Sequence, residues 1–177
     1  MAGAALVVYV GSIAGANWMI DHVGHLVPHA AHELPVGFGL EAPSGVYLAG
    51  LTFVARDIVQ RLAGLRVGVG AIVAGAVISW WVSTPTLALA SGATFLLSES
   101  CDFAVYTPLQ VRNFPFAVLG SGLLSDAVDS TVFLTLAGLP LSALLAGQLV
   151  GKAWLVLVGG ALAGLLRRYG PFRNPAP

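Results

Sequence analysis

The amino-acid sequence predicts an all-α membrane protein, a bundle of six transmembrane helices. Of its 177 residues, 57% are hydrophobic and only 9% are charged, and its mean hydropathy is +0.87. Soluble domains carry about 25% charged residues, so this composition is typical of membrane proteins. Six apolar segments have roughly the 20 residues that one bilayer crossing requires. The 22 glycines agree with this class, because small residues let transmembrane helices pack closely.

We expect a single integral membrane domain over residues 1–177, whose spans follow one another through mostly short connections. The longest connection, residues 21–43, contains Pro28 and Pro35, which argue against one continuous helix. The first span lacks the basic leading stretch of a signal peptide, so we expect it to be retained. In chain order the spans are predicted at about residues 4–20, 44–63, 67–83, 87–107, 116–137 and 141–166.

Basic residues near the span ends predict the orientation of the chain. They fall between spans two and three, between spans four and five, and after span six, whereas the alternate connections contain no Lys or Arg. Under the positive-inside rule this pattern predicts that both termini are cytoplasmic, in a multi-pass protein of the plasma membrane. The residues concerned are Arg61, Arg66, Arg112, Arg167, Arg168 and Arg173.

Seven ionisable residues lie inside the predicted spans, where each costs about 2.5–3.5 kcal/mol at a helix centre. Such residues must pair inside the bundle or line a water-filled cavity. Their estimated depths form two layers, in which Arg56 could pair with Asp102 or Glu99, and Lys152 with Asp129. The full set is Arg56, Asp57, Glu99, Asp102, Asp126, Asp129 and Lys152.

Two short segments repeat one pattern in consecutive spans of opposite direction. SESCD at 98–102 and SDAVD at 125–129 both have the form Ser-acid-x-x-Asp. Because residues three or four positions apart share one face of a helix, each acidic pair points to one side of its helix. We therefore expect the two acidic faces to point at the same place in the bundle.

The charges inside the spans do not balance, because five carboxylates against two basic residues leave −3 if all are ionised. Uncompensated carboxylates take up protons or bind a cationic ligand that donates hydrogen bonds. The alternative is a set of polar contacts that lock the helices together without a ligand. Aromatic rings could stack on a planar ligand, although such rings often belong to the core or the interfacial belt. The predicted substrate-binding residues are Asn17, Phe53, Arg56, Asp57, Trp81, Glu99, Asp102, Asp126, Asp129 and Lys152, with no catalytic residue.

Four histidines lie in the long connection, at His22, His25, His29 and His32. Imidazoles at this spacing can bind zinc. Pro28 interrupts the helical face, however, and the chain has neither an H-E-x-x-H sequence nor a second cysteine. We expect an exposed outer loop or an amphipathic interfacial segment here, and no metal or cofactor.

Four segments contain the ionisable residues of the predicted spans. They are LPVGFGLEAPSGVYLAGLTFVARDIVQRLAG, LSESCDFAVYTPLQ, SDAVDSTVFLTLAG and GQLVGKAW. Together, in the same order and spacing from about Asn17 to Lys152, they resemble the VUT family of queuosine precursor transporters. The chain departs from the family in residues 22–32 and at Gln110, where a basic residue is expected, and Asp126 has no match. The family's polar positions fall on Asn17, Asp57, Glu99, Asp102, Asp129 and Lys152.

The resemblance implies six helices arranged like the substrate-binding subunits of energy-coupling-factor vitamin transporters. It also implies uptake of 7-deazaguanine bases, the prequeuosine precursors of queuosine. A guanine-type edge presents adjacent N–H donors that one carboxylate can accept, and an aminomethyl arm would be a cation for a second carboxylate. The flat bicycle would stack on an aromatic ring.

Two alternatives to a self-sufficient importer remain at this stage. The chain could be a binding subunit for another vitamin-like molecule that docks on a separate ATP-driven module; it has no P-loop of its own. It could also be an intramembrane hydrolase, but it lacks a G-x-G-D element and its acids are paired within helices. We therefore expect a non-enzyme whose partners are a small purine-like solute and the bilayer, with a homo-oligomer or energising module possible and no nucleic acid.

Overall fold

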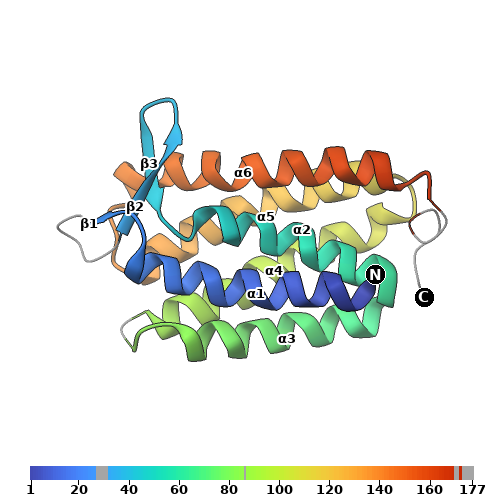
Figure 1. Cartoon of the computed structure of the whole chain (residues 1–177), viewed down its shortest axis with the longest axis horizontal. Coiled ribbons are helices and arrows are strands. Elements are labelled where there is room, and N and C mark those ends of the chain that lie inside the picture. Colours follow the sequence, from blue (N-terminus) through green and yellow to red (C-terminus); the bar gives the residue numbers. More distant parts are fainter. Residues whose placement is uncertain (27–31, 86, 170–171, 173–177) are drawn as a thin grey trace.

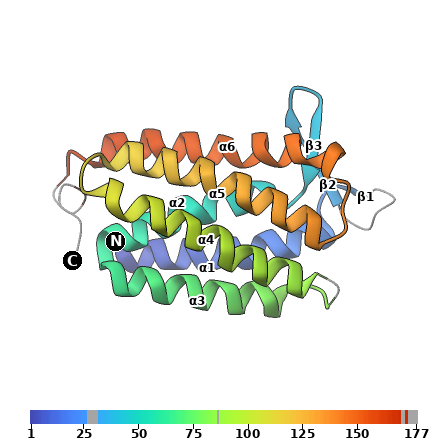
Figure 2. The same ribbon diagram turned by 180° about the vertical axis from the view of Figure 1, so that it is seen from behind.

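The computed structural model describes residues 1–26, 32–85, 87–169 and 172. Six helices lie side by side along the long axis of the molecule, and consecutive helices run in opposite directions (Figures 1 and 2). Each helix begins and ends within a few residues of a predicted span. They are α1 (Ala2–His22), α2 (Val46–Ala63), α3 (Leu65–Val82), α4 (Ala88–Gln110), α5 (Phe114–Leu136) and α6 (Leu141–Leu166).

A small antiparallel sheet lies at the end of the bundle opposite the two termini (Figure 1). Its strands are β1 (His25–Leu26), β2 (His32–Gly37) and β3 (Leu40–Pro43). The connection expected to be an exposed loop or an amphipathic interfacial segment thus contains three strands in its described part, which the sequence analysis did not predict. His29 and Pro28 lie outside the described residues. Phe38 and Gly39, both with positive φ, form the two-residue turn between β2 and β3, as such hairpin turns require, and Gly37 at the end of β2 also has positive φ.

The position of Pro35 explains how a proline fits into β2. Strand β1 pairs only with His32 and Glu33, so the stretch around Pro35 has a neighbour on one side alone, at β3. The pairing of β2 with β3 is also irregular between Pro35 and Gly37. A missing N–H is tolerated at such a free edge and next to a bulge, which is why the proline does not exclude a strand here.

Side chains and one close backbone contact attach the sheet to the helices. Trp154 Nε1 on α6 donates a hydrogen bond to the Val36 carbonyl at 3.1 Å, and Tyr47 on α2 donates to the Pro35 carbonyl at 3.1 Å. Gly147 on α6 faces the backbone of β3, where a Cβ atom would collide with the Glu41 carbonyl. The glycine therefore permits β3 to lie directly against α6.

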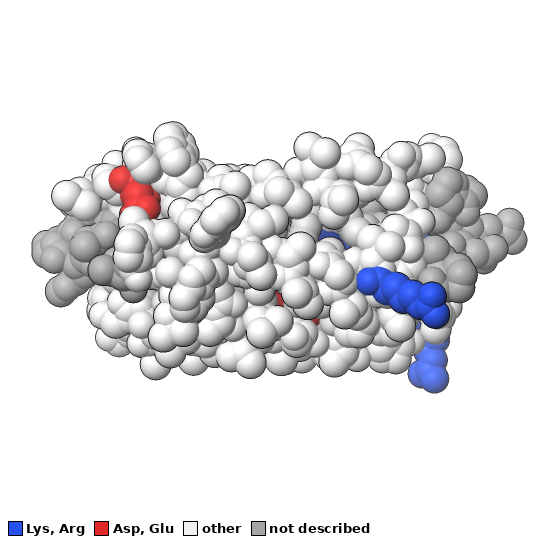
Figure 3. Space-filling view, turned by 90° about the horizontal axis from the view of Figure 1, so that it is seen from below, with Lys and Arg blue, Asp and Glu red and all other residues white. Residues whose placement is uncertain are grey.

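The outer surface of the bundle is apolar between its two ends. Large side chains that would be buried in a soluble protein are exposed here, among them Val7, Val73, Val77, Trp81 and Val158. Figure 3 shows one such face, with basic side chains gathered toward the end of the termini. By length and composition, α1, α3, α5 and α6 could each cross a membrane. These features identify a membrane protein.

Helices α2 and α4 are not among these four, and they carry four of the buried charges. Arg56 and Asp57 on α2 and Glu99 and Asp102 on α4 are at most 1% exposed. The remaining helices surround these side chains, so the interior of the bundle is polar where its surface is apolar. This distribution of polar and apolar side chains is the reverse of that in a soluble protein, and it places the ionisable side chains between the helices.

Arg61, near the end of α2, has a structural role rather than a free charge. Its Nη1 donates to the Gln110 carbonyl at 2.6 Å, and its Nη2 donates to the Phe172 carbonyl at 2.7 Å. The exposed basic residues at this end are Arg66, Arg112, Arg167 and Arg168, and Arg173 lies outside the described residues.

Candidate functional site

Lys152 organises a polar cluster near the middle of α6. Its Nζ donates to Asp129 Oδ2 at 2.7 Å, to Gln148 Oε1 at 2.7 Å and to Ser130 Oγ at 2.8 Å. Asp126 lies 3.6 Å from the same nitrogen and accepts a hydrogen bond from Ser130. The predicted pairing of Lys152 with Asp129 is confirmed.

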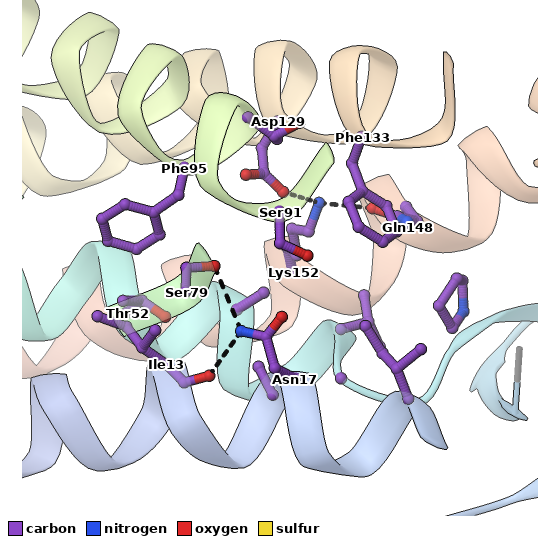
Figure 4. A pocket seen from close by; sticks show the side chains of 17 residues that line it. Ile13, Asn17, Thr52, Ser79, Ser91, Phe95, Asp129, Phe133, Gln148 and Lys152 are labelled. Atoms are coloured by element: carbon purple, nitrogen blue, oxygen red, sulfur yellow. Dashed lines mark hydrogen bonds and ion pairs between the residues drawn. The ribbon is translucent and has the colours of Figure 1, made fainter. Parts of the chain in front are cut away.

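This cluster forms one wall of a pocket in the half of the bundle nearer the sheet. All six helices and the end of β3 contribute to the pocket, whose volume is about 80 Å³. Figure 4 shows Asn17 on one side and Asp129 and Lys152 on the other, with Phe95 and Phe133 on either side of Asp129. The polar lining residues are Asn17, Thr52, Ser79, Ser91, Thr94, Asp129, Gln148 and Lys152.

Asn17 lines the pocket, but its side-chain amide is already hydrogen-bonded within the protein. Its Nδ2 donates to the Ile13 carbonyl at 3.0 Å and to Ser79 Oγ at 3.3 Å, and its Oδ1 accepts from Ser83. The amide therefore fixes α1 against α3 at the pocket wall. A ligand that binds Asn17 has to exchange one of these bonds.

A second cluster surrounds Arg56, deeper in the bundle. Its Nε donates to Glu99 Oε2 at 3.0 Å, its Nη2 lies 3.0 Å from Asp57 Oδ1 and contacts Asp102, and its Nη1 donates to Gln60 Oε1 at 2.6 Å. Both predicted alternatives for Arg56, Glu99 and Asp102, thus occur together. We call Arg56, Asp57, Glu99 and Asp102 the Arg56 cluster.

The Arg56 cluster is sealed from the pocket. None of its four residues lines the pocket, and their side chains are at most 1% exposed. Glu99, predicted to bind substrate, does not line this pocket, and its carboxylate pairs with Arg56 instead. The carboxylate that does reach the pocket is that of Asp129, whose side chain is 15% exposed.

The repeated Ser-acid-x-x-Asp segments meet between α4 and α5, as expected. Ser98 of the first segment donates to Asp129 of the second at 3.0 Å, and Ser125 of the second donates to Asp102 of the first at 3.0 Å. The serine of each segment thus donates a hydrogen bond to the aspartate of the other. The Ser98–Asp129 bond lies at the pocket wall and the Ser125–Asp102 bond lies at the Arg56 cluster, so the two bonds connect the two polar layers.

The aromatic residues of the pocket are not the ones that the sequence predicted. Trp81 is 87% exposed on the outer face of α3, and Phe53 is buried but does not line the pocket. The assignment of Trp81 to the site is corrected accordingly, and its exposure next to the end of α3 fits the interfacial alternative. The aromatic residues that line the pocket are Phe95 and Phe133.

Thr94 is a pocket residue that sequence reasoning missed. Its Oγ1 is buried and has no hydrogen-bond partner among the described residues. A signal was present, since Ser91, Thr94 and Ser98 recur at helical spacing on α4 ahead of Glu99 and Asp102. An unused buried hydroxyl facing a pocket is suited to a ligand's polar group.

One group of side chains outside the bundle could hold a metal ion. His25, Glu33 and Glu41 occupy one face of the sheet, and their potential ligand atoms lie within 4.8 Å of one another. His25 Nε2 and Glu41 Oε2 already form a pair at 3.1 Å. His32 instead bonds the Ile20 carbonyl through Nδ1 at 3.1 Å.

The described site therefore consists of a small pocket with a paired carboxylate and ammonium at its wall, and a sealed ionic cluster behind it. Comparison of the chain with protein-family models, with curated proteins and with solved structures finds no match.

Proposed function

We propose that this protein is a membrane transporter that imports queuosine precursors, the 7-deazaguanine bases of the prequeuosine type. The observation that carries the proposal is the pocket wall formed by Asp129, Lys152 and Gln148, flanked by Phe95 and Phe133 inside an apolar bundle. Charged and amide groups next to aromatic rings suit a flat, polar heterocycle.

The hydrogen-bonding groups of the wall complement a guanine-type edge. Such an edge places N–H donors beside a carbonyl oxygen. Asp129 can accept from the donors. The Lys152 ammonium, whose three protons are donated to Asp129, Gln148 and Ser130, can donate to the carbonyl in exchange for one of these bonds. The Thr94 hydroxyl supplies one more buried group for the rest of the solute.

The size of the pocket favours a small solute. Its 80 Å³ is well below the roughly 300–1,000 Å³ of pockets that bind drug-sized molecules, so a lipid or peptide does not fit. A bicyclic base requires some further opening, and the rings of Phe95 and Phe133 are the side chains at the wall whose rotation would provide it.

The placement of the pocket supports import. We propose that all six helices span the membrane with both termini in the cytoplasm, because the exposed arginines and the termini share one end of the bundle. The pocket then lies in the half of the bundle nearer the outside, beneath the sheet. The resemblance of four sequence segments to the VUT family leads to the same substrate class.

Uptake of isotopically labelled prequeuosine base by expressing cells tests the proposal. We expect Asp129→Asn to lower uptake at least about tenfold, because a hydrogen bond to a charged group contributes about 1.5–3 kcal/mol. Asp21→Asn is the matched control and should leave uptake unchanged, since Asp21 lies at the end of α1 and does not line the pocket.

Uptake by neither the wild type nor the variants would refute the substrate, whereas equal uptake by the wild type and Asp129→Asn would refute the site. The purified chain in lipid vesicles gives the complementary measurement. Uptake there would show that no separate ATP-driven module is needed.

A further inference from the structure

The Arg56 cluster holds an excess of negative charge. One guanidinium faces three carboxylates, those of Asp57, Glu99 and Asp102, which leaves −2 if all are ionised. A buried carboxylate without a compensating charge is strongly disfavoured, and water does not reach these side chains because they are at most 1% exposed. Cations or protons have to compensate the excess.

The structure argues against a pocket ligand as the compensating cation. The Arg56 cluster does not line the pocket. The nearest buried ammonium, on Lys152, is engaged by Asp129 and Asp126. Among the groups that face Glu99, Asp57 on α2 and Asp129 on α5 are acidic and Tyr9 on α1 is a phenol, so Arg56 is the cation in its described surroundings.

We propose that the Arg56 cluster is a proton-binding site, that Glu99 carries the exchangeable proton, and that the protein co-transports protons with its solute. This inference rests on the proposed transport function. Glu99 accepts a hydrogen bond from Arg56 through Oε2, while its Oε1 is buried without a hydrogen-bond partner. Oδ2 of Asp57 is buried without a partner as well, so the position of Glu99 in the bundle decides between the two. A proton on Oε1 neutralises the carboxyl and leaves the Arg56 contact intact.

Glu99 is also the member of the cluster that lies next to the pocket wall. The preceding residue, Ser98, donates to Oδ1 of Asp129, whose Oδ2 binds Lys152 at the pocket. A solute that engages Asp129 therefore changes the charge distribution beside Glu99, and by reciprocity the proton on Glu99 affects solute affinity. This is the contact through which the two binding events are coupled.

A polar connection leads from the cluster toward the end of the termini. Arg56 Nη1 donates to Gln60 Oε1 at 2.6 Å, and Gln60 Nε2 donates to Thr107 Oγ1 at 3.1 Å. In the proposed cycle the proton enters from the outer side, binds the Glu99 carboxylate and leaves on the cytoplasmic side when the solute has been released. No bond other than O–H forms or breaks.

Transport by the purified full-length protein in lipid vesicles tests the coupling. With the membrane potential held at zero, an inward proton gradient of one pH unit should accumulate labelled prequeuosine base about tenfold if one proton accompanies each neutral base. A pH-sensitive dye inside the vesicles should report acidification that depends on the base. Glu99→Gln should reduce accumulation to about onefold, and the matched variant Glu41→Gln, at an exposed position of β3, should retain it.

Equal uptake with and without the gradient would overturn proton coupling while leaving the transport function intact. If the base neither binds nor enters, the transport function has failed instead. Infrared spectroscopy then tests the proton site without any solute. The wild type at neutral pH should show the carbonyl stretch of a buried protonated carboxylic acid, which Glu99→Gln should remove and Glu41→Gln should not.

The infrared measurement remains a test even if Glu99→Gln fails to fold, because the spectrum of the wild type alone can contradict the proposal. Absence of the protonated-acid band from the wild type would overturn it. A band that persists unchanged in folded Glu99→Gln would exclude Glu99 as the carrier.

Discussion

At the scale of a single residue, Thr94 is a position where ligand binding can be changed without loss of protein stability. Its hydroxyl is buried at the pocket and has no hydrogen-bond partner among the described residues, so its removal breaks none of the hydrogen bonds found there. Lys152 is the opposite case, because its ammonium holds Asp129 and Gln148 and any substitution would strand a buried carboxylate.

We predict that Thr94→Val, which keeps the shape of the side chain, weakens binding of the prequeuosine base about fivefold to tenfold. A lost hydrogen bond to a neutral group costs roughly 0.5–1.5 kcal/mol, and the melting temperature should not fall. Calorimetric titration and thermal unfolding of the purified protein measure the two quantities. Thr135→Val, at an exposed threonine of α5, is the control; an unchanged affinity in Thr94→Val would exclude the hydroxyl from the site.

Residue-level prediction succeeded where depth and charge determine the answer and failed where the packing of helix faces determines it. The pairings of Arg56 and Lys152 follow from depth and from the need to compensate buried charge, and both were predicted. Trp81 was assigned wrongly because the apolar sequence of α3 does not indicate which face points inward. Phe95 and Phe133 face the pocket only through packing of α4 and α5 against other helices, which no local pattern encodes.

At the scale of elements, glycines determine how closely the sheet and the helices approach. Gly147 on α6 meets the β3 backbone, and Gly45 before α2 meets the backbone of α1 at Ala16. The small-residue spacing of Gly147 and Gly151 was visible in the sequence, but their partners were not. Gly151 faces Val46 of α2, and the strand opposite Gly147 was not predicted at all.

We predict that Gly147→Ala destabilises the protein by about 1–3 kcal/mol, because its Cβ would collide with the Glu41 carbonyl. For a chain of this size that is a fall of roughly 2–4 °C in melting temperature per kcal/mol. Thermal unfolding in detergent provides the measurement. Gly11→Ala is the matched control, since no atom lies within 4 Å of its added Cβ, and it should be neutral or slightly stabilising. Equal melting temperatures for the two variants would contradict a tight contact between β3 and α6.

At the scale of the whole molecule, the number of spans determines on which side of the membrane each connection lies. Hydropathy was enough to predict all six helices to within a few residues, because apolar length is a property of each segment by itself. It was not enough for the sheet, whose strands are short and whose pairing joins residues across the connection. Of the helices in the described residues, only α1, α3, α5 and α6 are long and apolar enough to cross a membrane when each helix is judged by itself.

Single-cysteine labelling distinguishes six spans from four. In a Cys101→Ser background, which removes the one native cysteine, Phe38→Cys on the β2–β3 turn should react with a membrane-impermeant maleimide in intact cells. Arg66→Cys, in the first turn of α3, should react only after permeabilisation if α2 crosses the membrane. Reaction of Arg66→Cys in intact cells would instead leave α2 outside and indicate four spans.

The reciprocal bonds between Ser98 and Asp129 and between Ser125 and Asp102 restrict how the bundle can move. A slide of α4 along α5 by one residue, about 1.5 Å, would stretch both bonds at the same time. The two helices therefore behave as one rigid body. A gate that admits a solute has to open where this pair of helices meets α1, α3 or the sheet. Asn17, whose amide hydrogen-bonds α1 to the end of α3, lies in this region.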